Sequence, residues 1–129
     1  MNASDLMAKA RRAISSAKLL LDSGDADGAC NRAYYAMFDA ARAALLASGS
    51  PVEPEIARTH SGLITAFSLH LVKTKLVPVE LGKALNKAED LRLVADYKGD
   101  PIEKEDAEWA VLQARAFVEA MQSKFMQNL

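Results

Sequence analysis

The sequence is poor in the residues that mark several common classes of protein. Its 129 residues include one cysteine, and no apolar run approaches the length of a membrane span. A single cysteine cannot form an internal disulfide, which fits a reducing compartment. Asp5 stands before the apolar residues of the N-terminal segment, so neither a signal peptide nor a membrane span is expected. We therefore expect a cytoplasmic protein without membrane contact.

The signatures of familiar catalytic sites are also missing. There is no Gly-rich phosphate-binding loop and no Cys/His cluster with zinc spacing, so no metal and no cofactor is expected. Cys30 lies among apolar neighbours and is expected to be a buried small hydrophobe rather than a nucleophile. His60 falls on the apolar face of a predicted helix and His70 at its edge, which favours structural roles for both.

Charge and hydropathy favour one folded domain. Lys and Arg number 16, Asp and Glu number 17, and half of the residues are apolar, which is typical of a soluble globular protein. At this length we expect a single domain over residues 1–129. The formal net charge of −1 predicts no bulk attraction to nucleic acid but leaves room for a local basic patch.

The stretch Asn31–Leu46 organises the rest of the chain. Alanines recur here at alternating spacings of four and three, which places them on one helix face: Ala29, Ala33, Ala36, Ala40, Ala43 and Ala47. Beside them lies a face of larger apolar residues: Cys30, Tyr34, Met37, Phe38, Ala41 and Leu45. A helix that buries two faces is the central member of a bundle. We therefore predict a central helix over about 25–48.

The same periodicity predicts the other helices. They cover about 5–21 with Ser4 as N-cap, a segment from between Pro54 and Thr59 to Leu71 with Ile56 inward, then Pro78–Asp96 and Glu103–Phe125. Gly62 lowers the helix propensity of the second of these segments, so the helix can be interrupted near residues 59–62. No segment alternates with period two. The prediction is an all-α, antiparallel up-and-down bundle of four to five helices.

Polar residues cluster at the end of the predicted helix Pro78–Asp96. Arg92 follows Glu89 by three residues and precedes Asp96 by four, which are the spacings of ion pairs on one helix face. Tyr97 comes next in the chain. One interpretation is a solvated set of ion pairs, each worth a few tenths of a kcal/mol. The other is an arginine held at a helix end to meet a phosphate, and the spacing alone favours the first.

The polar side of the central helix is a second candidate site. Its residues Asn31, Tyr35, Asp39 and Arg42 recur at helical steps. They could line a ligand-binding groove or a subunit contact together with Glu89 and Arg92. A solvated helix face explains the charged residues well, but it explains Tyr35 less well.

Three segments resemble the HEPN domain family (higher eukaryotes and prokaryotes nucleotide-binding). The run NRAYYAMFDAARAALLASG resembles the second helix of that domain, and RTHSGLITAFSLHLVKT and AEDLRLVADY resemble later segments of one prokaryotic branch. The resemblance implies a four-to-five-helix bundle that is usually dimeric. Many members are metal-independent ribonucleases, whereas others partner minimal nucleotidyltransferases, often in toxin–antitoxin pairs.

The ribonuclease members carry an arginine followed, after four to six residues, by a histidine. Arg92 matches that arginine, but Asp96 and Tyr97 stand roughly where the histidine would come. A carboxyl group cannot replace an imidazole without a large pKa shift, and tyrosine is a poor base near neutral pH. The departure argues against ribonuclease activity and leaves the inferred fold unchanged.

Three hypotheses follow. The leading one is a dimeric HEPN-type module, non-catalytic or weakly catalytic, that binds nucleotide or RNA, a nucleotidyltransferase-like partner, or both, in a toxin–antitoxin-type system. The second is a metal-independent ribonuclease that uses Arg92 with Asp96, Tyr97 or a histidine brought in from elsewhere. The third is a purely structural oligomerisation bundle.

Overall fold

Helices account for nearly all of the secondary structure. The computed structural model describes residues 1–126, and within them there is no β-strand. The elements are α1 (Ala3–Asp22), α2 (Ala26–Ala47), α3 (Pro54–Ala57), α4 (His60–Phe67), the π-helical turn η1 (Ser68–Val72), α5 (Val79–Leu93), the π-helical turn η2 (Val94–Lys98) and α6 (Lys104–Phe125). The all-α bundle predicted from periodicity is confirmed.

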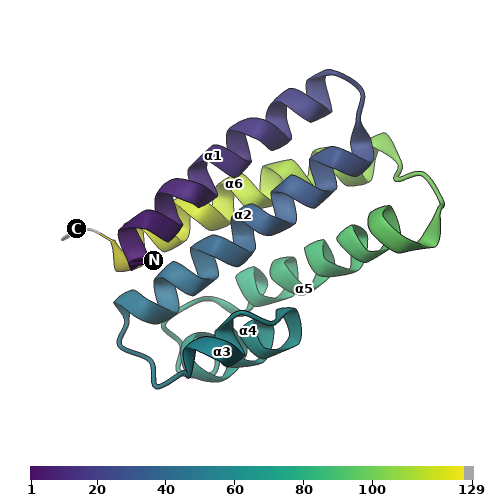
Figure 1. The fold of residues 1–129 in the computed structure, drawn as a ribbon. Helices are drawn as coiled ribbons and strands as arrows, with labels where there is room; N and C mark the ends of the chain where they lie inside the picture. Colours follow the sequence, from purple (N-terminus) through teal and green to yellow (C-terminus); the bar gives the residue numbers. More distant parts are fainter. Residues whose placement is uncertain (127–129) are drawn as a thin grey trace.

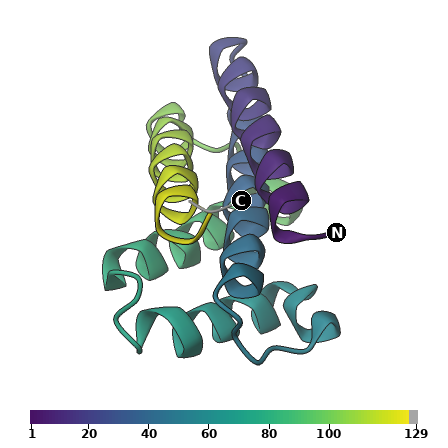
Figure 2. The ribbon, with the colours of Figure 1, turned by 90° about the vertical axis from the view of Figure 1, so that its left-hand side faces the viewer.

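The long helices run side by side, and successive ones are antiparallel (Figure 1). The short helices α3 and α4 lie across one end of the bundle, beneath α2 (Figure 2). The turn between α1 and α2 contains Gly24 in a left-handed conformation, and Asp25 caps α2 through the backbone NH of Gly28 at 2.8 Å. No helix within residues 1–126 combines the length and the apolar character that crossing a bilayer requires.

The central position predicted for the second helix is confirmed. Helix α2 packs against α1, α4, α5, α6 and η2. Its buried residues include both predicted faces, from Ala29 to Ala43 and from Cys30 to Leu45. The alanine face lets neighbouring helices approach closely, because it carries no side chain beyond Cβ. Ala47 departs from the prediction, since it lies in the last, exposed turn of the helix.

Several element boundaries differ from the predicted ones. Helix α1 begins two residues early: Asn2, not Ser4, is its N-cap, and Asn2 and Asp5 form a capping box. The expected break falls at Arg58–Thr59, where Thr59 caps α4 and accepts a hydrogen bond from the NH of Gly62 at 3.0 Å. Ile56 is not inward as predicted, because α3 is a separate short helix on which Ile56 is 48% exposed.

The predicted helix Pro78–Asp96 ends differently from expectation. Pro78 is its N-cap, and regular α-helix stops at Leu93, after which the chain widens into the π-helical turn η2. Gly99, in a left-handed conformation, ends that turn. The connection to α6 is tied to α2, because the NH of Ile102 donates to Asp27 at 3.0 Å. The segment that leads into α6 is thereby held against the first turn of α2.

Candidate functional site

A buried arginine lies where α2 meets α5 and η2. Arg92 is 3% exposed. Its Nη2 donates to Oε2 of Glu89 at 3.1 Å and its Nη1 donates to Oδ2 of Asp96 at 3.5 Å. The ion pairs suggested by the sequence spacing therefore form, but the interpretation of Arg92 as a solvated arginine is wrong. Burial lowers the pKa of Arg92, but the hydrogen bond and charge of Glu89 lead the effects that raise it, so the guanidinium stays charged.

Three tyrosines surround this guanidinium. Its central carbon lies 5.2 Å from the ring centroid of Tyr34, 5.9 Å from that of Tyr35 and 6.0 Å from that of Tyr97. These are cation–π distances, and Arg is the cation that most often uses them. The Nε of Arg92 is buried and has no hydrogen-bond partner within the described residues. The side chain is thus positioned by two carboxylates and by aromatic rings, and its Nε is left without a partner among those residues.

Tyr34 links the arginine to a histidine. The Tyr34 hydroxyl lies 2.8 Å from Nδ1 of His60, and the His60 ring also packs against Tyr35 and Phe38. Burial raises the pKa of Tyr34 far above its usual range, and the nearby Glu89 carboxylate raises it further. Tyr34 therefore stays protonated. The helical periodicity placed Tyr34 on an apolar face. No residue near Tyr34 in the sequence predicted that His60 of α4 would contact its hydroxyl.

The polar residues predicted on two separate helices meet at this point. The Nδ2 of Asn31 lies 3.3 Å from both carboxylate oxygens of Asp96. The structure therefore brings Asn31, Tyr35, Glu89, Arg92, Asp96 and Tyr97 into one cluster, which we call the Arg92 cluster. Tyr97 is its most accessible member, at 75% exposure. Tyr97 is exposed and Tyr35 is half-buried, whereas Arg92 is closed off by its neighbours.

Asp39 and Arg42 lie farther along α2, outside the Arg92 cluster. Their side chains approach to 4.0 Å. Asp39 is only 4% exposed, so its assignment to a solvated face is wrong. Burial raises the pKa of Asp39, and the charges of Lys9 and Arg42 offset only part of that rise.

A groove between α1 and α2 contains these two residues. It has a volume of about 550 Å³ and is lined by Lys9, Arg12, Ala13, Ser16, Asn31, Arg32, Tyr35, Phe38, Asp39 and Arg42. The contribution of α1 to this groove was not predicted from the sequence. A signal was present, because Lys9, Arg12 and Ser16 recur at helical steps outside the apolar stripe of that helix.

The structure also places the possible metal ligands and the single thiol of the described residues. Within residues 1–126, no three His, Cys, Asp or Glu side chains come together as metal ligands would. Cys30 is 1% exposed, and burial raises the pKa of its thiol to about 12. A thiol that stays protonated is a poor nucleophile, so the interpretation of Cys30 as a buried hydrophobe is confirmed.

Comparison with known proteins identifies the family. The model of the HEPN domain family matches residues 3–124. This chain belongs to the HEPN family. Its relatives include a UPF0332 protein of Gloeobacter violaceus, 35% identical over 117 residues, which are 89% of this chain and 89% of that protein. A UPF0332 protein of Thermotoga maritima is 36% identical over 94% of this chain and 88% of that protein.

A third HEPN-type relative carries a functional name. A protein of Methanocaldococcus jannaschii named "Putative toxin" is 32% identical over 90% of this chain and 83% of that protein. The family assignment agrees with the resemblance found in the sequence. The Arg92 cluster and the groove are therefore sites on a HEPN domain.

Proposed function

We propose that this HEPN chain is a nucleotide- or RNA-binding module that acts as a homodimer and does not itself cleave RNA. The observation that carries the proposal is the enclosure of Arg92. Both of its terminal nitrogens are engaged by carboxylates, so a phosphate would have to displace Glu89 or Asp96 to reach the guanidinium. The accessible groups around it, Asn31, Tyr35 and Tyr97, are suited to hydrogen bonding and stacking on bases.

The proposal includes a protein partner. The names of the relatives support a place in a toxin–antitoxin-type system. The HEPN resemblance makes a nucleotidyltransferase-like protein the expected partner. No metal or cofactor enters this proposal.

The decisive experiment separates binding from cleavage. Purified protein is incubated with structured RNA in EDTA, and binding of a labelled single-stranded RNA is followed in parallel by fluorescence anisotropy. We expect binding without cleavage. Tyr35→Ala and Asn31→Ala should weaken binding, whereas Lys124→Ala, at the end of α6, should not. Metal-independent cutting by the wild type would contradict the non-catalytic part, and failure to bind any RNA or nucleotide would contradict the rest.

One observation favours a second function, a metal-independent ribonuclease. The contact between Tyr34 and His60 joins an imidazole to the network of Glu89 and Arg92. In that mechanism His60 would take the proton of the ribose 2′-OH as this oxygen attacks the adjacent phosphorus. The 5′-oxygen would leave as a hydroxyl, receiving that proton from His60 through water, and a 2′,3′-cyclic phosphate would remain. Arg92 would stabilise the charge of the phosphorane.

Histidine variants test this alternative. If it is correct, cleavage in EDTA is lost in both His60→Ala and Arg92→Ala. The matched control is His70→Ala, because His70 is the other histidine and lies on η1, outside the Arg92 cluster. Equal activity of the His60 and His70 variants would rule out His60 as the base.

A further inference from the structure

The groove between α1 and α2 concentrates positive charge in a chain whose net charge is −1. Lys9 and Arg12 come from α1, and Arg32 and Arg42 come from α2. A single carboxylate, Asp39, lines the same groove and is almost fully buried. The solvent-facing part of the groove is therefore cationic. A groove of one sign of charge focuses the field and attracts polyanions.

Three of the four cations are available. Lys9, Arg12 and Arg32 are exposed and form no ion pair with other residues of the described range 1–126. Arg42 is half-buried and only approaches Asp39, at 4.0 Å. Arginine binds phosphate through two parallel hydrogen bonds when nothing else occupies its fork. These side chains differ in this respect from Arg92, whose two terminal nitrogens already donate to Glu89 and Asp96.

Aromatic rings line the same groove. Tyr35 is half-buried, and Phe38 lies beneath Arg42, whose guanidinium carbon is 5.8 Å from the Phe38 ring centroid. Tyr35 also borders the Arg92 cluster, so it stands where the groove and the cluster meet. Cations that follow a backbone and rings that stack on bases are the two components of sites for single-stranded nucleic acid. A purely acidic protein segment would use the cations and have no need of the tyrosine.

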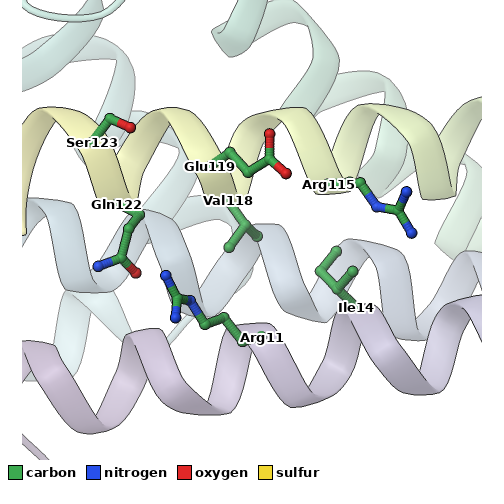
Figure 3. A pocket seen from close by; sticks show the side chains of 7 residues that line it. All are labelled: Arg11, Ile14, Arg115, Val118, Glu119, Gln122 and Ser123. Carbon is green, nitrogen blue, oxygen red and sulfur yellow. The ribbon is translucent and has the colours of Figure 1, made fainter.

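A second groove provides the comparison. It lies between α1 and α6, has a volume of about 500 Å³, and contains Arg11 and Arg115 together with Glu119 and Gln122 (Figure 3). Its remaining lining is Ile14, Val118 and Ser123, so it has no aromatic ring. Here a carboxylate stands among two arginines at the surface. This groove lacks both the charge excess and the stacking platform of the other.

We infer that the α1–α2 groove is a binding track for the phosphodiester backbone of single-stranded RNA, with Tyr35 stacking on a base at the end near the Arg92 cluster. The polar stretch of α2 from Asn31 to Arg42 gives the track a length of about 16 Å, at 1.5 Å per residue. The inference rests on the proposed function of RNA binding and adds a site to it. A duplex fits less well, because its base faces are stacked and unavailable to Tyr35.

Paired charge variants test the track. Binding of a fluorescent oligouridylate is measured for the full chain, for the double variant Arg12→Ala/Arg32→Ala, and for Arg11→Ala/Arg115→Ala. Both variants lose two arginines, but only the first loses them from the groove. We expect the dissociation constant to rise about tenfold or more for the groove variant and to change less than about twofold for the control. The slope of log K against log salt should become shallower by about 1.4 only in the groove variant.

Tyrosine variants test the stacking. Tyr35→Ala should weaken binding about tenfold, whereas Tyr35→Phe should bind like the wild type because it keeps the ring. Thermal unfolding of each variant establishes that it is folded. Equal losses in the two double variants would overturn the inference, as would competition by polyglutamate or duplex RNA that matches the single strand. If the wild type binds RNA and the groove variants bind equally well, only the track is wrong; if the wild type binds none, the proposed function fails with it.

Discussion

At the scale of single residues, Arg92 combines a full charge with almost complete burial. Two partly exposed carboxylates neutralise it, and the ring of Tyr34 covers its guanidinium. Removing one partner of a buried ion pair leaves the other charges uncompensated, which costs more than the pair itself contributes. Arg92 is therefore a structural residue of the cluster as well as a candidate for function. The interpretation from spacing, a solvated set of ion pairs each worth a few tenths of a kcal/mol, therefore does not apply to Arg92.

We accordingly predict that Arg92→Ala lowers the free energy of unfolding by about 2–4 kcal/mol, because Glu89 and Asp96 lose their common counter-charge. Urea unfolding followed by circular dichroism measures this. The control is Arg32→Ala, an exposed arginine of α2 without an ion pair within residues 1–126, which should change the stability by less than about 0.5 kcal/mol. Similar urea midpoints for the two variants would show that the cluster does not depend on Arg92.

Asp39 gives a prediction that depends on pH. Burial raises its pKa in the folded protein above that of the unfolded chain, although Lys9 from α1 and Arg42 from α2 oppose the rise. The stabilisation linked to Asp39 is therefore complete below its unfolded pKa, about 3.9, and is lost as the pH rises through the folded value. Asp39→Asn should be more stable than the wild type at neutral pH, and this advantage should shrink in acid. Urea midpoints across the acidic range measure it, and a difference independent of pH would be contrary evidence.

At the scale of elements, the alanine face of α2 sets how closely its neighbours pack. Ala36 and Ala40 are fully buried between helices. We predict that Ala36→Leu or Ala40→Leu lowers the free energy of unfolding by about 1–3 kcal/mol through overpacking. Ala47→Leu is the matched control, since Ala47 follows the same spacing but lies in the exposed last turn. Wild-type urea midpoints for the buried variants would mean that α2 is not the packed centre.

The elements also show what periodicity can and cannot predict. It identified the long helices and the burial of α2, because the apolar pattern of a helix is a local property. It missed the π-helical turns η1 and η2, since a wider turn depends on how the segment packs rather than on its own residues. The N-cap of α1 was predicted at Ser4, because Asn2 and Ser4 are both residue types that cap helices. The choice between them depends on the capping box that Asn2 forms with Asp5.

The candidate site was predictable only in part for a similar reason. The pairing of Arg92 with Glu89 and Asp96 follows from spacing along one helix. The burial of Arg92 does not, because it depends on the tyrosines of α2, which are far away in sequence. The contact between Tyr34 and His60 and the contribution of Lys9 and Arg12 to the groove are also long-range. To predict either feature, one must know how two helices are placed relative to each other.

At the scale of the whole molecule, we predict that the protein is a homodimer in solution. The proposed interface is centred on the end of α5 and η2, beside the polar side of α2, and Tyr97 exposes a large aromatic ring there next to charged groups. Exposed tyrosines of this kind are enriched at interfaces. Two-fold symmetry would bring two Arg92 clusters into one cleft and two α1–α2 grooves toward it. A single RNA strand could then contact both protomers.

Light scattering at high protein concentration measures the mass, and a strictly monomeric wild type would contradict this prediction. Tyr97→Asp should shift the protein toward the monomer, because it places two like charges near the symmetry axis. Leu112→Asp is the matched control: Leu112 is 64% exposed and lies on α6, outside the proposed interface. If Leu112→Asp dissociates the dimer and Tyr97→Asp does not, the interface lies on α6. The two Arg92 clusters would then be separate, and each groove would bind RNA on its own protomer.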